Sequence, residues 1–207
     1  PIYIAVGESA TTLFFFDKDS STPLWTHDIG SGVMSVSVSA DGEYIVAGSN
    51  DNKVYLFDKD SCTPLCSYSV GSYDVEQVSI SADGEYIAVG TEGNHKLYLF
   101  DKDSSTPIWN YTTGSYVVAA ISADGEYIAA GSIDNKVDFF ARDSNTPLWS
   151  YTTDHDVCSV GISADGKYIT AGSYDKNVYA SQNSLADRPS IIPYGPRSGS
   201  EPTESVT

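Results

Sequence analysis

The chain has 207 residues, 41% of them hydrophobic and 19% charged, which is enough apolar material to bury a core. Its formal net charge of −17 would be repelled by phosphate backbones, so the composition argues against nucleic-acid binding. No apolar run approaches the ~20 residues of a membrane-spanning helix, so we expect no membrane insertion. The 15 Tyr, with Val, Ile, Thr and Phe, favour an all-β fold.

The predicted strands begin with residues 3–7, which match residues 44–48 and therefore form the second strand of an incomplete first unit. One complete unit spans residues 33–73, with alternating polar and apolar positions at 35–39 that indicate a strand. Further strands are predicted at 44–48, 54–57 and 65–70, separated by turns at 41–42, 50–53 and 58–64. Three complete units follow the first, and a fifth begins near Val157.

Three markers repeat in a fixed order along the chain. Ala-Asp-Gly stands at 40–42, 82–84, 123–125 and 164–166, a spacing of about 41 residues. Asp-Lys-Asp stands at 17–19, 58–60 and 101–103, and Thr-Pro at 22–23, 63–64, 106–107 and 146–147. Because Gly accepts a positive φ, the Ala-Asp-Gly residues are predicted to make tight turns: Asp41, Gly42, Asp83, Gly84, Asp124, Gly125, Asp165 and Gly166.

Four short strands make a small sheet that cannot bury both faces alone. Stacking such sheets around an axis solves the problem, so we predict a β-propeller of about five blades built from four-stranded repeats of about 41 residues, with incomplete first and last units. The strict periodicity of Trp25, Trp109 and Trp149 indicates that they dock one sheet on the next.

The repeat pattern ends at residues 178–180, without a further Thr-Pro or Trp. We therefore divide the chain into a repeat domain, 1–181, and a Pro/Ser/Gly-rich tail, 182–207. The tail contains Ile191 and Ile192. We expect it to lie against strands of the first or fifth unit, in its own chain or, preferably, a neighbouring one, because an open sheet edge accepts an added strand.

Residues 80–88, Ile-Ser-Ala-Asp-Gly-Glu-Tyr-Ile-Ala, resemble the WD40-like repeats of prokaryotic propellers. Residues 97–101 through Ile108-Trp109 look like the pyrroloquinoline-quinone-type (PQQ-like) repeat. Such hybrid repeats are found in surface proteins of methanogenic archaea and their relatives, and the chain is similar to these over residues 3–180. The Gly-His pair of eukaryotic WD40 repeats is absent, and Phe57-Asp58 stands where Trp-Asp would.

The residues suggest no catalytic, cofactor-binding or metal-binding site, and we expect no cofactor. Asp-Lys-Asp resembles the start of a calcium loop, but a Gly at the sixth position and a later Glu are missing, so a plain turn is favoured. Cys62 and Cys66 flank a turn and could pair, but the preferred interpretation is that they replace Ser and Trp of sister repeats. The remaining breaks in the pattern are Asp138, Glu76-Gln77 and His95.

Asn110-Tyr111-Thr112 is an acceptor pattern for N-glycosylation, and with the acidity it suits an extracellular or cell-surface protein. Because the chain starts at Pro1, we expect a processed protein or a fragment. The preferred function is a non-enzymatic assembly subunit that binds protein, chiefly copies of itself, with a filament formed by strand exchange through the tail. The alternatives are a ligand-binding propeller of the lectin or peptide-receptor type and, third, a quinone-dependent enzyme.

Overall fold

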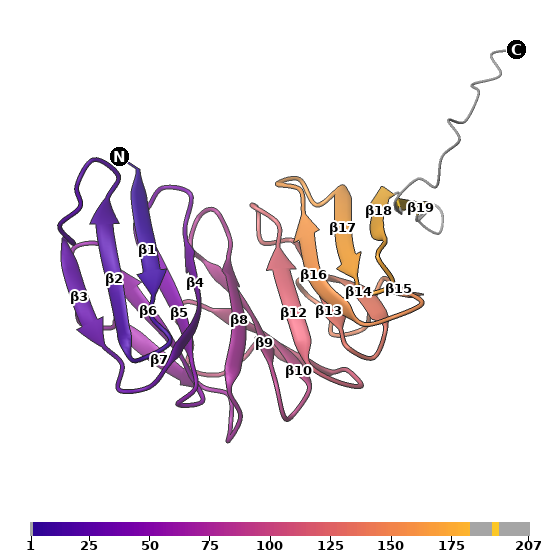
Figure 1. Ribbon diagram of the computed structural model, residues 1–207, viewed down its shortest axis with the longest axis horizontal. Coiled ribbons are helices and arrows are strands. Elements are labelled where there is room, and N and C mark those ends of the chain that lie inside the picture. The colour runs from indigo at the N-terminus through magenta and orange to yellow at the C-terminus, as the bar shows by residue number, and fades with distance from the viewer. Residues whose placement is uncertain (1, 183–191, 195–207) are drawn as a thin grey trace, which may run out of the picture.

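The computed structural model describes residues 2–182 and 192–194. The strands of this part form five antiparallel sheets, one with three strands and four with four (Figure 1). No helix occurs among the described residues. The predicted all-β, propeller-type architecture of about five repeated sheets is therefore confirmed.

Each sheet is built from strands that are consecutive in the chain. The first strands are β4 (Val33–Val38), β8 (Val75–Ile80), β12 (Val117–Ile121) and β16 (Val157–Ile162). The second strands are β1 (Tyr3–Gly7), β5 (Tyr44–Ser49), β9 (Tyr86–Thr91), β13 (Tyr127–Ser132) and β17 (Tyr168–Ser173). The third strands are β2 (Thr12–Asp17), β6 (Lys53–Asp58), β10 (Lys96–Asp101), β14 (Lys136–Ala141) and β18 (Val178–Gln182). The fourth strands are β3 (Trp25–Asp28), β7 (Cys66–Ser69), β11 (Trp109–Thr112), β15 (Trp149–Thr152) and β19 (Ile192–Tyr194).

The sheets follow one another along a row, and the first and fifth sheets lie at its opposite ends (Figure 1). The first strands of neighbouring sheets contact one another, as in β4 with β8, β8 with β12 and β12 with β16. The inner, first-strand side of the row is therefore where the sheets come closest, as expected around a propeller axis.

The core lies between the sheets and is made of two kinds of face. We call the face that packs on the following sheet the front face, and in the second sheet it carries Val46, Val54 and Leu56. The back face packs on the preceding sheet and carries Ile45 and Phe57 in the second sheet. All five side chains are at most 1% exposed. Alternate residues of one strand thus fill two different cores, which explains why these strands are apolar on both faces.

The Ala-Asp-Gly segments lie in the turns between the first and second strands of sheets two to five. In the second sheet Gly42 N–H donates to the carbonyl of Ser39 at 2.9 Å, and Gly42 has φ of +76°. The Asp41 carboxylate accepts hydrogen bonds from the Ser39 hydroxyl at 2.6 Å and from the Glu43 amide at 3.0 Å. These hydrogen bonds stabilise the charged carboxylate and lower the pKa of Asp41.

The remaining turns repeat this geometry. The equivalent serine–aspartate pairs are Ser81 with Asp83, Ser122 with Asp124, and Ser163 with Asp165, all at 2.6–2.7 Å. The glycines that follow, Gly84, Gly125 and Gly166, also have positive φ.

The same turns tie one sheet to the next through the backbone. Ala40 N–H donates to the carbonyl of Ala82 at 3.0 Å, Ala82 to Ala123 at 2.9 Å, and Ala123 to Ala164 at 3.0 Å. Serine hydroxyls add contacts along the inner strands: Ser35 accepts from the amide of Val78 at 3.1 Å. The repeated Ala therefore marks a backbone position that every sheet presents to its neighbour.

The second strands of the three central sheets are buried from their second residue onward, and their fourth strands are more exposed. Blades that pack on both sides have this order of burial, because their second strands lie between two neighbouring sheets. In the terminal sheets the order breaks down, because the part of the chain that the structure describes covers β1 and β17 on one face only.

The two ends of the row differ in how complete their sheets are. The first sheet has only β1, β2 and β3, as the repeat boundaries predicted. The sequence offered no fourth strand for the fifth unit, yet β19 pairs antiparallel with β18, with Tyr179 opposite Pro193. An unpaired strand edge accepts any extended segment, and a proline is tolerated in an outer strand. The segment separated as a tail thus contributes Ile192 to the fifth sheet, while Ile191 lies outside the described residues.

The turn glycines are expected to matter through contact with the preceding sheet as well as through φ. A Cβ atom at Gly125 (φ +68°) would lie 2.5 Å from Cδ2 of Tyr86, whereas at Gly30 (φ +81°) it would have no atom within 4 Å. We predict that Gly30→Ala lowers the free energy of unfolding by about 1 kcal/mol from backbone strain alone. Gly125→Ala should cost about 1–3 kcal/mol more, because the methyl group overlaps the ring. Urea denaturation measures both, and equal losses would contradict the packing role.

Candidate functional site

The tryptophans predicted to pack the blades begin fourth strands and face the next sheet. The Trp25 ring lies 5.5 Å from Phe57 of the second sheet, and its Nε1–H donates to the carbonyl of Lys59 at 2.7 Å. Trp109 repeats this contact, donating to the carbonyl of Arg142 at 2.6 Å. Each of these indoles thus supplies both apolar area and one hydrogen bond between sheets.

Trp149 occupies the same place in the fourth sheet and stacks on Phe139, with ring centroids 5.3 Å apart. Its Nε1 is buried without a hydrogen-bond partner among the described residues. The carbonyl that would accept this bond by analogy belongs to residue 183, because β18 ends one residue earlier. Residue 183 lies outside the described residues.

In the second sheet Cys66 stands where the other sheets have tryptophan, and Tyr68 makes the contact instead. The Tyr68 hydroxyl donates to the carbonyl of Lys102 at 2.6 Å, and its ring lies 4.8 Å from Phe100 of the third sheet. Burial raises the pKa of Tyr68, so the hydroxyl keeps its proton and remains a donor. Cys62 and Cys66 are both free thiols.

The Asp-Lys-Asp segments form turns in which the first carboxylate accepts the amide two residues on. Asp17 accepts from Asp19 at 2.9 Å, and Asp58 accepts from Asp60 at 2.8 Å. In the second and third segments the central lysine pairs with a glutamate of the Ala-Asp-Gly-Glu turn, as Lys59 does with Glu43 at 3.0 Å and Lys102 with Glu85 at 3.5 Å. These are the hydrogen bonds expected of the plain-turn interpretation.

Two of the residues that break the repeat have structural roles. Asp138 is only 2% exposed, and its carboxylate accepts a hydrogen bond from Ser150 on the neighbouring strand. Burial raises the pKa of Asp138. His95 lies in the turn after β9 with φ of 57°, a left-handed conformation.

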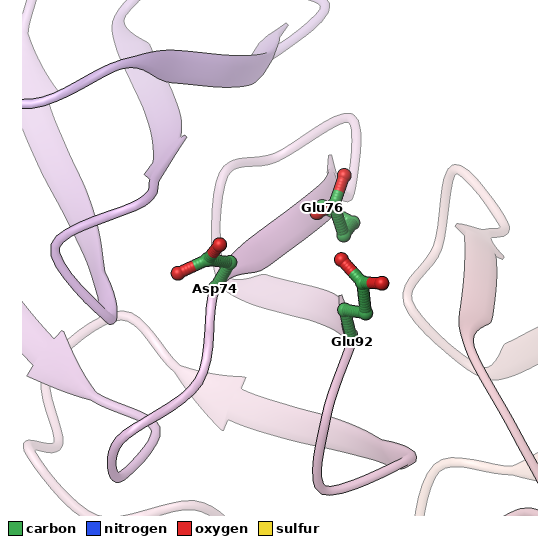
Figure 2. Close-up of side chains that lie close together, drawn as sticks. All are labelled: Asp74, Glu76 and Glu92. Atoms are coloured by element: carbon green, nitrogen blue, oxygen red, sulfur yellow. The ribbon is translucent and has the colours of Figure 1, made fainter.

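The structure assembles a group of carboxylates that sequence reasoning did not find. Asp74 precedes β8, Glu76 lies within it, and Glu92 follows β9. Ligand oxygens of the three lie within 4.8 Å of one another, at the ends of these neighbouring strands (Figure 2). This end of the sheet is opposite the Ala-Asp-Gly turn.

A β-bulge aims Glu76 into this group. The pairing of β8 with β9 shifts register between Val75 and Gln77, which leaves Glu76 as the extra residue. The equivalent bulges in β4 and β16 carry Met34 and Cys158. Bulges re-aim side chains, and this position varies where its neighbours repeat. The pattern of a repeat interrupted at one inner-strand position could have revealed this site.

The pKa of Glu76 is raised chiefly by burial. A hydrogen bond with Glu92 and the charges of Glu92 and Asp74 raise it further. None of the ion pairs within residues 2–182 involves these three carboxylates. Oxygen ligands of this kind suit a hard divalent cation, but Ca²⁺ takes ~6–8 oxygens, so water or backbone would have to complete a shell.

Asn110, the predicted glycosylation residue, lies in the outer strand β11 and is half-buried. Its carbonyl accepts a hydrogen bond from the Asn145 side chain at 3.2 Å. No helix in the described part of the chain is long and apolar enough to cross a membrane.

Comparison with protein families finds the WD domain, G-beta repeat, matched at residues 21–58 and 145–179. Both matched segments start in the turn before a fourth strand and end in the third strand of the next sheet. Each therefore spans one junction between sheets. No curated protein matches the chain.

Tyr68 is predicted to carry a hydrogen bond that its equivalents do not. Tyr68→Phe should lower the free energy of unfolding by about 1–2 kcal/mol, because the partly buried carbonyl of Lys102 loses its stronger donor and keeps only the Cys66 thiol at 3.7 Å. Tyr111→Phe is the control at the same place in the third sheet, where Trp109 already makes the contact. It should change stability by less than about 0.5 kcal/mol. Equal effects in urea denaturation would show that the hydroxyl bond is not the cause.

Glu76 is predicted to destabilise the fold at neutral pH. Its raised pKa means that the folded state binds the proton more tightly than the unfolded state, so stability grows as pH falls through that pKa. Glu76→Gln should therefore raise Tm by about 1–2 °C at pH 7, a small effect because the group is partly exposed, and the gain should vanish near pH 4.

Glu85→Gln is the control for this pH dependence, because Glu85 pairs with Lys102 at 3.5 Å. It should give no gain in Tm at pH 7. A thermal melt in which Glu76→Gln is neutral or destabilising at pH 7 would contradict the raised pKa of Glu76 and its cost to the folded state.

Proposed function

We propose that this chain of WD40-like β-propeller repeats is a non-enzymatic interaction scaffold that assembles with copies of itself through the two end sheets. WD40 repeats generally act as non-catalytic scaffolds that mediate protein–protein interaction. The observation that carries the finer proposal is the back face of the first sheet, which the described residues leave exposed at Ile4, whereas its counterparts in the later sheets are buried: Ile45, Ile87, Ile128 and Ile169.

The back face of the first sheet is apolar and open. Ile4 and Val6 are 47% and 45% exposed, whereas the equivalent Ile45 and Ala47 are fully buried. Opposite them across the strand pair lie Phe16 and Phe14, whose rings stack at 6.2 Å. An exposed apolar face on an acidic chain suits a protein partner. The inner edge of β1 also pairs with no strand among the described residues.

The front face of the fifth sheet is the matching half of the same interface. Tyr168 is 54% exposed, whereas Tyr127 stacks on the turn glycine of the following sheet. Val178 is 50% exposed, and its equivalent Val54 is fully buried. Within one chain every front face meets the next back face. A second copy offers the same complement to each open end.

This contact is head-to-tail, because the two surfaces differ and each end of the row presents only one of them. Such contacts build a ring when the rotation closes and a filament when it does not. The strand exchange through the tail expected from the sequence is not required for it, because β19 pairs with β18 of its own chain.

An extracellular or cell-surface location is part of the proposal. It is supported by the net charge of −17, the Asn110-Tyr111-Thr112 pattern and the resemblance of the repeats to those of archaeal surface proteins. The half-buried position of Asn110 on an outer strand leaves this pattern on the periphery of the row.

The assembly proposal predicts that charge on either end face blocks self-association. Ile4→Glu and Val178→Glu should each leave a monomer in sedimentation velocity over a concentration series, in about 0.5 M salt to screen the acidic charge. Ile108→Glu is the matched control, because Ile108 is 45% exposed within the third unit. It should associate like the unmodified chain.

Mixing the two blocked variants tests the head-to-tail geometry. Each retains one intact end, so an equimolar mixture should stop at a pair of one copy of each variant. Association of either variant to the level of the unmodified chain, or a monomeric unmodified chain, would overturn the proposal.

A further inference from the structure

A cavity of about 420 Å³ lies between the second and third sheets, beside Cys66. Its walls include Tyr44, Leu56, Leu65, Cys66, Lys102 and Ser104. This volume falls within the ~300–1,000 Å³ of small-molecule sites. It lies at one of the repeated junctions between sheets, so the other junctions show what normally fills the space.

At the equivalent junctions an indole ring fills the space. The Trp25 ring lies between Phe15 of its own sheet, at 5.0 Å, and Phe57 of the next sheet, at 5.5 Å. Register places Leu56 opposite Cys66 as Phe15 is placed opposite Trp25. The second sheet therefore keeps the apolar wall of the indole position and replaces the indole with a thiol.

The contact made by Tyr68 restores the lost hydrogen bond but not the lost ring. Its hydroxyl reaches the Lys102 carbonyl, and its own ring packs on Phe100. A carbonyl oxygen has two lone pairs, and the second donor here is the Cys66 thiol at 3.7 Å, a weak donor that a ring N–H can replace. The junction thus offers apolar walls, a hydrogen-bond acceptor and an open space where the other junctions hold an indole ring.

The remaining walls suit the face of an aromatic ring. Tyr44 lines the cavity, and the ammonium group of Lys102 lies 5.9 Å from its ring centroid. Aromatic faces stack on tyrosine and attract cations. Asp103 and Ser104 place polar groups among the lining residues.

We propose that the cavity beside Cys66 binds a planar aromatic group of indole size, in the space that tryptophan fills at the sister junctions. The ring packs on Leu56 and Tyr44, and a ring N–H donates to the Lys102 carbonyl. This site is independent of the end faces proposed for assembly.

Fluorine NMR with 5-fluoroindole tests the site in the full chain. We expect line broadening and a shift change that saturate at millimolar probe. Cys66→Trp should weaken binding by about tenfold or more, because the new ring occupies the cavity. Cys62→Trp is the matched control, since Cys62 is exposed and absent from the cavity lining, and it should bind like the unmodified chain. Cys66→Ala should retain binding, which shows that the thiol itself is not required.

Two probes distinguish the source of the ring. 5-Fluoroindole represents a free small molecule, and N-acetyl-tryptophanamide represents a side chain presented on a peptide. Binding of either one that is lost in Cys66→Trp but kept in Cys62→Trp supports the site and indicates its source. Failure of both probes to bind, or equal binding to the two tryptophan variants, overturns it. If Cys66→Trp does not fold, the unmodified chain and Cys66→Ala still decide, because absent binding to both refutes the proposal.

Discussion

The docking of one sheet on the next is the contact on which the rest of this structure depends. A sheet of three or four short strands has too little apolar surface to bury either face alone, so its two faces must be covered by neighbours. Many of the repeated apolar residues serve that contact. Ile45 and Phe57 of the second sheet pack on the preceding sheet, and Val46 and Leu56 pack on the following one. Tryptophan or Tyr68 ties each outer strand to the turn after the third strand of the next sheet, and the Ala-Asp-Gly turns add backbone hydrogen bonds between neighbouring sheets.

Much of this fold could be predicted from the sequence because its signals are local and recur. The Ala-Asp-Gly spacing predicted the four later sheets. The match of residues 3–7 to 44–48 predicted a first sheet of three strands. Gly125 illustrates why the marker is so regular, because it meets both a φ requirement and a close approach of Tyr86. A residue under two constraints varies little between copies.

The candidate sites were harder to predict, because they arise where one copy departs from the others. Glu76 gains its direction from a register shift, and one of its two partners, Glu92, follows the neighbouring strand β9. Tyr68 makes the inter-sheet hydrogen bond that a tryptophan at position 66 would make. This replacement is visible only in the structure, which places the Lys102 carbonyl beside the Tyr68 hydroxyl. β19 was missed because pairing by backbone groups needs no side-chain pattern.

The series of backbone hydrogen bonds from Ala40 through Ala82 and Ala123 to Ala164 links each sheet only to its nearest neighbours. Cooperativity in such a row is passed from sheet to sheet, so opening begins at an end and advances inward. Amide protons of the third sheet, which lies in the middle of the row, would then exchange with solvent most slowly, and those of β1 and β18 fastest. The rate of amide exchange in a strand would therefore report how far its sheet lies from the nearest end of the row.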